Sequence, residues 1–157
     1  MRRVPLLCAL AVMAAIFATG RAQSPANTQP FESAWTAGEA ARSQGEWPLA
    51  IAHYRDALKI NPQHAQARFY LALAYRETAR YYEARRNFRL ALNAHSADRA
   101  WVSQCRLEIA ACWEATHQYR EALAEYQLAL AANGSAEAEQ GQRRTLALLH
   151  SPTDHSK

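Results

Sequence analysis

The sequence predicts an all-α protein built from repeated pairs of helices. Three segments, which begin at Trp47, Tyr81 and Tyr119, share one pattern: an aromatic residue, alanine three positions on, a second aromatic four further, then Ala-Leu at three and four after that. Glycine and proline account for only 5 and 6 of the 157 residues, which favours helix. The first two copies lie 34 residues apart, and this period indicates a helix pair that must stack on its neighbours to bury its apolar face.

Each repeat is expected to split into two helices joined by a tight turn. The three units cover 31–64, 65–98 and 99–134. Their helices are expected, in order, at 31–44 and 47–60, 63–78 and 81–94, and 97–116 and 119–132. Gly45 lies in the first turn, and Pro62 should end one helix and fit the first turn of the next. Ser96 is predicted to cap the helix that begins the third unit.

The third copy of the pattern arrives four residues late, which amounts to one additional helical turn in 97–116. This longer helix carries an apolar stripe on one face. Its members are Trp101, Cys105, Ile109 and Cys112. We expect the stripe to pack on the preceding helix, 81–94.

A final helix is expected to close the array. Asn133 and Gly134 form a helix stop, and Ser135 can cap a helix over 135–150. This segment has one weakly apolar face and an otherwise polar surface, as a capping helix requires. Residues 151–157 are predicted to be a frayed tail.

The N-terminal segment, 1–22, has the features of a secretory signal. A positive start precedes an uncharged apolar run over 4–18, and small residues allow cleavage after Ala22. The run is short for a membrane span, which needs roughly 20 apolar residues, so an uncleaved anchor is the alternative. Cleavage would give an exported protein, and the Ala/Arg-rich composition favours a bacterial periplasm. Residues 23–30, with two prolines and no charge, are predicted to be a flexible leader.

Charge and cysteine content narrow the class further. Residues 1–22 hold three arginines, and without them the chain has 15 basic and 14 acidic side chains. This balance does not give the concentrated positive charge that nucleic-acid binding requires.

Cys105 and Cys112 are seven residues apart on one expected helix, so about 10 Å apart, too far for a disulfide with each other. They are either buried small apolar residues or partners in an intermolecular disulfide.

The chain resembles the tetratricopeptide repeat family, whose pattern is Trp-x2-Leu-Gly-x2-Tyr followed by Ala-x3-Phe, Ala and Pro. The first copy matches at Gly38, Ala50, Tyr54, Ala57 and Pro62. The second matches at Leu71, Tyr75, Ala84, Phe88 and Ala91. The third fills the positions with Ile109, Ala110, Trp113, Ala122, Tyr126 and Ala129. The resemblance implies a right-handed superhelix of three antiparallel helix pairs plus a capping helix.

In that family the first helix of each pair lines a concave groove. Carrying the groove positions over gives an apolar strip edged by charged residues, which fits a peptide or a helix of a partner protein. The expected partner-binding residues are Trp35, Glu39, Arg42, Phe69, Leu73, Arg76 and Leu107. Arg42 and Arg76 would meet acidic groups of the partner. The alternative is that Phe69 and Leu73 only pack between neighbouring repeats.

Two further features bear on the partner. Some family members bind a C-terminal carboxylate with Lys, Asn and Arg, but those positions here hold Trp35, Glu39, Tyr70, Gln104 and Glu108. The carboxylate clamp is therefore absent. The second repeat is the basic one, and three arginines of its second helix could form a basic surface on the convex side for an acidic partner or a membrane surface. These arginines are Arg85, Arg86 and Arg89. The alternative is a solvated face whose charges pair within the chain.

The sequence contains no constellation typical of an enzyme. The six histidines lack zinc-ligand spacing, and neither a Gly-rich phosphate loop nor a nucleophile elbow is present. We therefore expect no catalytic residues, no metal, no cofactor and no small-molecule substrate. The expected function is a protein-binding module or scaffold in a cell-envelope assembly. The alternative is a repeat module that self-associates or stacks end to end as a homo-oligomer.

Overall fold

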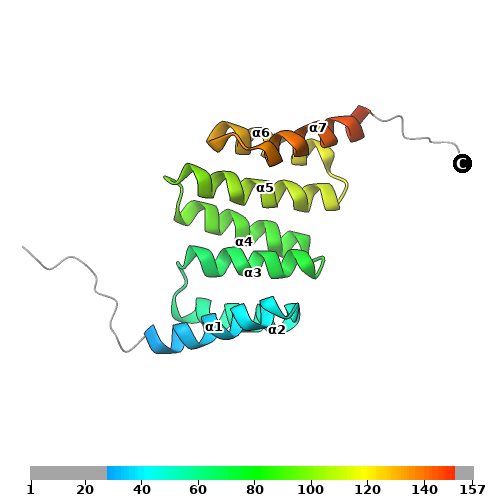
Figure 1. Cartoon of the computed structure of the whole chain (residues 1–157). Helices are drawn as coiled ribbons and strands as arrows, with labels where there is room; N and C mark the ends of the chain where they lie inside the picture. The colour runs from blue at the N-terminus through cyan, green and yellow to red at the C-terminus, as the bar shows by residue number, and fades with distance from the viewer. Residues whose placement is uncertain (1–27, 151–157) are drawn as a thin grey trace, which may run out of the picture.

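The computed structural model describes residues 28–150, which form seven α-helices and no strand (Figure 1). The helices are α1 (Thr28–Ser43), α2 (Trp47–Ile60), α3 (Ala65–Glu77), α4 (Tyr81–Ala94), α5 (Arg99–Ala115), α6 (Tyr119–Asn133) and α7 (Ala136–His150). They stack in chain order, and each helix packs against the next. The predicted all-α architecture is confirmed. The predicted signal segment 1–22 and the tail 151–157 lie outside the described residues.

The helices α2 and α4 have the bounds that the repeat pattern predicts, whereas α1 and α3 begin elsewhere. Helix α1 begins at Thr28, three residues earlier than expected and inside the segment predicted to be a leader. Helix α3 begins at Ala65, because Pro62 lies in the preceding turn and not in the first turn of the helix. His64 caps α3, and its Nδ1 accepts a hydrogen bond from the backbone N–H of Ala67 at 3.1 Å.

The additional turn of the third repeat lies at the start of α5. Asp98, not Ser96, caps this helix, because its carboxylate accepts hydrogen bonds from the backbone N–H groups of residues 100 and 101. In the added turn, Trp101 donates from Nε1 to the carbonyl of Ala91 at 2.9 Å. The expected packing on α4 is confirmed. The same ring also lies 5.2 Å from the ring of Phe69 in α3.

The turns inside the three pairs follow one design. Gly45, Ala79 and His117 occupy equivalent positions with φ of 73°, 58° and 59°. After each of them, the next N–H reaches back to the carbonyl five residues earlier, as from Glu46 to Ala41 at 2.9 Å. This is the Schellman arrangement that closes a helix with a left-handed residue. Only the first copy has glycine at this position, although the left-handed conformation favours glycine.

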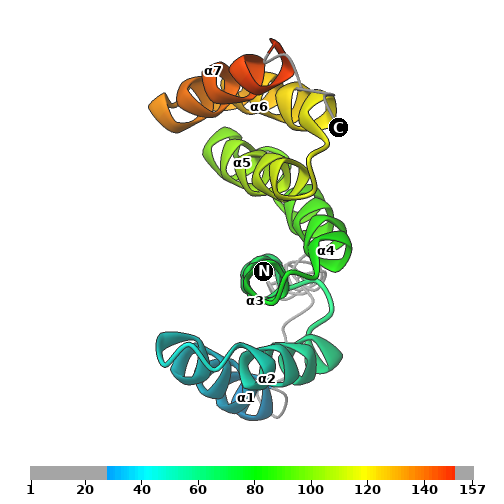
Figure 2. The same ribbon diagram turned by 90° about the vertical axis from the view of Figure 1, so that its right-hand side faces the viewer.

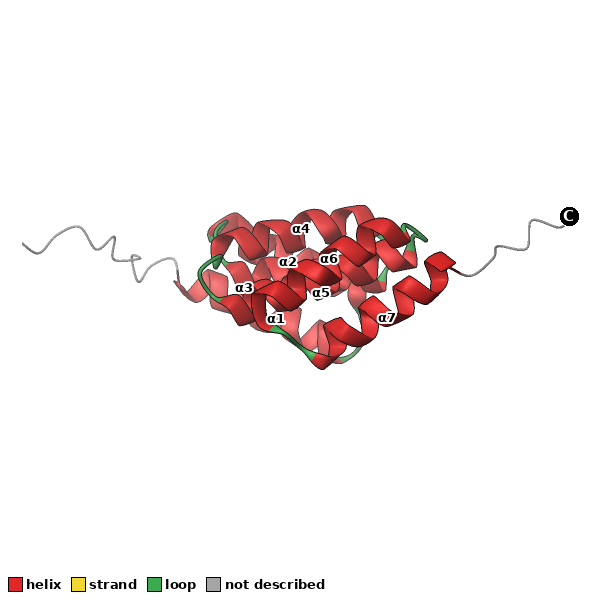
Figure 3. Ribbon diagram, turned by 90° about the horizontal axis from the view of Figure 1, so that it is seen from above, coloured by secondary structure: helices red, strands yellow, loops and turns green. Residues whose placement is uncertain are grey.

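The array has two layers that curve together. Seen from above, α1, α3, α5 and α7 lie along one side and α2, α4 and α6 along the other (Figure 3). Contacts between helices two apart join α3 with α5 and α5 with α7, which places the odd-numbered helices on the inner side of the curve. The side view shows the helix pairs rotating along the stack (Figure 2). We call the solvent-facing side of the odd-numbered helices the inner face.

The core uses small residues to let helices approach closely. Ala50, Ala84 and Ala122 are wholly buried. The tight fit extends to Gly38, where an added Cβ would come within 2.7 Å of the ring of Tyr54.

The two cysteines of the third repeat are part of the same core. Cys105 and Cys112 are free and 0% exposed, and burial raises the pKa of each thiol to about 12. Of the two alternatives left open by the sequence, burial as small apolar residues is the one that this packing supports. An intermolecular disulfide would require the core to open.

Candidate partner-binding face

Three successive links join the odd-numbered helices along the inner face. The guanidinium of Arg42 in α1 lies 4.9 Å from the ring centroid of Tyr70 in α3. Arg76 in α3 forms an ion pair with Glu108 in α5. Further along, α5 and α7 are joined through Glu114, described below. The inner face is therefore one connected surface and not four separate helices.

At the first end of the face, a carboxylate is held by two donors. Arg42 donates from Nη2 to Oε2 of Glu39 at 2.8 Å, and the hydroxyl of Tyr54 donates to Oε1 of the same carboxylate. Burial alone would raise the pKa of Glu39, but these hydrogen bonds outweigh it and the pKa is lowered. The carboxylate therefore stays charged and paired inside the chain.

The middle of the face carries more negative than positive charge. Arg76 binds both Glu77, at 2.8 Å, and Glu108. Burial raises the pKa of Glu108, the positive charge of Arg76 opposes this, and the negative charges of Glu77 and Glu137 add to it. One guanidinium thus pairs with two carboxylates, and the charge of a third, Glu137, also acts on Glu108.

The far end of the face is a partly buried polar cluster that joins the capping helix to α5 and α6. Glu114 in α5 accepts hydrogen bonds from Tyr126 at 2.9 Å, from Thr145 at 2.6 Å and from Nε of Arg144 at 3.2 Å. Burial would raise the pKa of Glu114, but these donors together lower it. The charge of Glu114 is therefore balanced by hydrogen-bond donors, two of which, Thr145 and Arg144, attach α7 to α5.

The apolar residues predicted to anchor a partner differ in how far they are exposed. Phe69 is only 8% exposed and lies 5.2 Å from both the Phe88 and Trp101 rings, so it belongs to the core. It cannot serve as a surface anchor, because the added turn of α5 brings Trp101 over it. Leu73 and Leu107 remain half-buried on the odd-numbered helices.

Trp35 is also half-buried, and its surroundings are aromatic. Its ring lies within 6.4 Å, centroid to centroid, of Phe31, Tyr54, His64 and Tyr70. Most of its contacts are therefore made within the chain, which fixes the position of α1 against α2 and α3.

The two arginines expected to meet acidic groups are already engaged by carboxylates of this chain. The partner of Arg42 is Glu39, three residues away on the same helix, a spacing from which the pair could have been predicted. The main cross-helix partner of Arg76 is Glu108, 32 residues away, and no local signal indicates it. Both guanidinium groups are therefore already paired and are not available to bind acidic groups of a partner.

The three arginines of α4 have different surroundings. The guanidinium of Arg85 stacks 3.6 Å from the ring centroid of Trp113. Arg89 lies 3.8 Å from Glu125, a longer ion pair. Arg86 is exposed and forms no ion pair within residues 28–150. The sequence therefore located a basic helix but did not distinguish the arginine that packs from those that face solvent.

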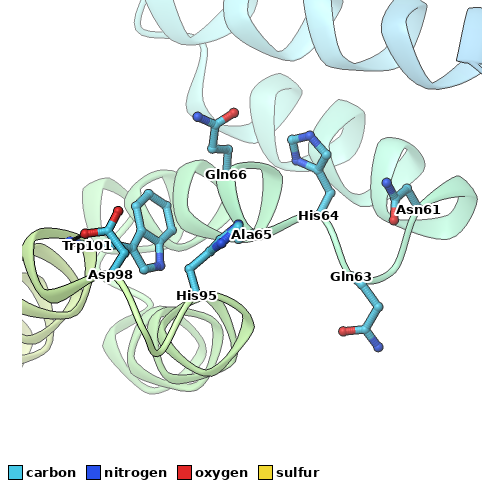
Figure 4. Close-up of a pocket in the computed structure, with 8 residues that line it drawn as sticks. All are labelled: Asn61, Gln63, His64, Ala65, Gln66, His95, Asp98 and Trp101. Atoms are coloured by element: carbon cyan, nitrogen blue, oxygen red, sulfur yellow. Dashed lines mark hydrogen bonds between the residues drawn. The ribbon is translucent and has the colours of Figure 1, made fainter. Parts of the chain in front are cut away.

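A pocket of about 410 Å³ lies beside the start of the predicted strip, since its lining residues His64 and Trp101 contact the rings of Trp35 and Phe69 (Figure 4). It is lined by Asn61, Gln63, His64, Ala65, Gln66, His95, Asp98 and Trp101. Its two best-defined polar groups, on His64 and Asp98, already cap α3 and α5. No group of three or more possible metal ligands occurs among the described residues.

This fold and this connected inner face define a helical-repeat protein. Residues 38–78 match the family model described as TPR repeat. These residues are therefore similar to a tetratricopeptide repeat, and α1–α7 together have the fold of tetratricopeptide-repeat domains, as the sequence resemblance implied.

Solved structures agree in fold at low sequence identity. The Arabidopsis OM64 TPR domain is 22% identical with a TM-score of 0.69, over 78% of this chain and 98% of that one. The N-terminal domain of stress-induced protein-1 from C. elegans is 17% identical with a TM-score of 0.71, over 78% and 99%. The TPR2B domain of yeast Sti1, solved with an Hsp70 peptide, is 20% identical with a TM-score of 0.68, over 76% and 98%.

A search of curated protein sequences gave no match. Among residues 28–150, no helix combines the length and the apolar character that crossing a bilayer requires.

Proposed function

We propose that this protein is a non-enzymatic module that holds a peptide or helix of a partner protein on its inner face. The observation that carries the proposal is the series of links from α1 to α3, α5 and α7, which makes four helices one surface. Leu73 and Leu107 supply half-buried apolar contact on it. A rigid surface lowers the ordering cost of binding, so such links favour a role in recognition.

The charges of the inner face indicate what the partner segment should carry. Glu77, Glu108 and Glu137 outnumber Arg76 in the middle of the face. The partner segment should therefore combine apolar side chains with flanking lysine or arginine, since complementary charge guides specificity. This differs from the acidic partner expected from unpaired arginines.

The structural neighbours do not define the partner of this chain. The yeast Sti1 domain was solved with an Hsp70 peptide, but the carboxylate-clamp positions here hold Trp35, Glu39, Tyr70, Gln104 and Glu108. Three of these side chains, Glu39, Tyr70 and Glu108, already interact with arginines of the chain. We therefore propose a partner other than an acidic chaperone tail.

Site-specific photo-crosslinking in the producing cell tests the inner face. A photoreactive phenylalanine analogue replaces Gln104, an exposed residue of α5 that lies beside Glu108. The matched control places it at Gln127, an exposed glutamine of α6 on the other layer. We expect a crosslinked partner protein from position 104 and none from position 127.

The products decide between the proposals. A partner captured only from Gln127, or equally from both positions, would contradict binding on the inner face. A crosslink from position 104 to a second copy of the chain would instead favour self-association, the alternative to a separate partner.

We further propose that the protein is exported and acts in the cell envelope after cleavage near Ala22. The apolar run and small residues of 1–22 support this proposal. N-terminal sequencing of the protein from fractionated cells tests it. A periplasmic protein that starts at Gln23 is expected, whereas an intact N-terminus in the membrane fraction would favour the anchored alternative.

A further inference from the structure

The outward side of α4 carries an exposed stripe of basic and apolar side chains. It consists of Tyr82, Arg86, Arg89, Leu90 and Asn93. These spacings place all five on one side of the helix, over a length of about 16 Å. Tyr82 is 71% exposed and Leu90 is 38% exposed. Five large apolar side chains are exposed among the described residues, and two of them, Tyr82 and Leu90, lie on this stripe beside its arginines.

The stripe contains no carboxylate, and its cations are poorly neutralised. Arg86 has no ion pair within residues 28–150. Burial, and after it the charge of Arg86, lowers the pKa of Arg68 in the neighbouring helix, so two like charges lie near each other. Arg89 is 3.8 Å from Glu125, whose other oxygen binds Arg106 at the shorter distance of 2.8 Å.

The equivalent stripes of α2 and α6 lack this combination. On α2 the positions hold Pro48, Ala52, Arg55, Asp56 and Lys59, and the last two pair with each other at 2.7 Å. On α6 they hold Arg120, Ala124, Gln127, Leu128 and Ala131, so one arginine and one leucine, 46% exposed, lie there without a second arginine or an aromatic side chain. Of the three stripes, only that of α4 therefore joins two arginines to an exposed tyrosine and an exposed leucine.

We propose that the outward stripe of α4 is a second binding surface, which takes an acidic segment of a partner protein. Carboxylates of that segment would pair with Arg86 and Arg89, which lie about one turn apart, while its apolar side chains contact Tyr82 and Leu90. Arginine favours such pairing because its fork matches carboxylate geometry. Aromatic and arginine side chains are also the common anchors of protein interfaces.

The small number of arginines on the stripe favours a protein segment over a polyanion. Anionic lipid surfaces are recognised by clusters of about four to eight basic residues. Nucleic acid requires a concentrated basic patch. The stripe has two arginines, interleaved with an aromatic and an aliphatic side chain, which suits a short acidic and apolar peptide.

Fluorescence anisotropy with the purified protein tests the surface. The probe is a labelled 12-residue peptide that alternates glutamate with leucine, and its twin carries glutamine for every glutamate. We expect the acidic peptide to bind at least tenfold more tightly than its twin. The double variant Arg86→Gln with Arg89→Gln should reduce that binding at least tenfold, with an unchanged circular dichroism spectrum.

Two control variants remove an arginine from the stripes of the other two outer helices: Arg55, at the position of Arg89, and Arg120, at the position of Tyr82. Arg55→Gln on α2 and Arg120→Gln on α6 should each change the affinity less than twofold. Equal binding of the two peptides, no binding at millimolar peptide, or full binding by the double variant would overturn the proposal. So would tighter, Arg86-dependent binding of phosphatidylserine vesicles or single-stranded DNA, since the surface would then read a polyanion.

Discussion

The turns within the three helix pairs allow the cost of a left-handed backbone residue to be measured in two ways, by adding a Cβ at one turn and by removing one at another. Gly45 and Ala79 occupy the same left-handed position, with φ of 73° and 58°. Alanine in this conformation costs roughly 1–2 kcal/mol, while glycine loses about 0.4–1 kcal/mol more chain entropy on folding. The balance predicts that Ala79→Gly stabilises the protein by about 1 kcal/mol and that Gly45→Ala destabilises it by a similar amount.

Neither substitution is complicated by packing. A Cβ added at Gly45 meets nothing within 4 Å, and Ala79 is exposed. Urea unfolding followed by circular dichroism measures both free energies. Since about 1 kcal/mol corresponds to roughly 4 °C for a domain of this size, thermal midpoints should move in opposite directions. A loss of stability in Ala79→Gly would refute the argument that the left-handed backbone is the source of the strain.

Three further predictions concern packing, pH and thiol reactivity. Gly141→Ala should destabilise the protein by about 1–2 kcal/mol, although alanine has the better helix propensity, because the new Cβ would come within 2.5 Å of the Tyr126 ring. The control in urea unfolding is Gly134→Ala, whose Cβ has room and which should change the stability little. Burial lowers the pKa of His64 below 6.5, so the unfolded chain takes up the proton more readily and stability should fall as the pH drops below about 6.5. His64→Asn keeps a capping side chain and should flatten that part of the pH profile, and an unchanged profile would exclude this histidine as the cause. In protein that starts at Gln23 and so lacks Cys8, the two thiols of the third repeat should react with Ellman's reagent at pH 8 only in denaturant. Reaction in the native protein would show that the core opens.

Most of the fold could be predicted from the sequence periodicity, because the helix pairs depend on residues that recur at fixed spacing. Ala84 and Phe88 illustrate this, since both are predicted core positions and both are 0% exposed. Capping was less predictable. Ser96 and Asp98 are both good capping residues, and the one used depends on where the added turn of α5 begins.

The site was less predictable than the fold because it depends on contacts between distant parts of the chain. Phe69 has the spacing of a groove residue, but Trp101, 32 residues later, covers it. The pairing of Arg76 with Glu108 has the same separation, and it reverses the charge that the inner face offers. Sequence patterns define which side of a helix a residue occupies, and the packing of neighbouring repeats decides whether that side remains free.

The two proposed surfaces have opposite charge and lie on opposite layers of the array, which bears on the role of the protein as a scaffold. The carboxylates around Glu108 and the stripe around Arg86 share no ion pair within residues 28–150. Sites that share no partners contribute independently in most proteins. A saturating segment bound on the inner face should therefore change the affinity of the acidic 12-residue peptide for α4 by less than twofold in anisotropy titrations. A larger change would mean that occupation of one face alters the stacking of the helices, and the chain would then transmit binding between partners and not simply bridge them.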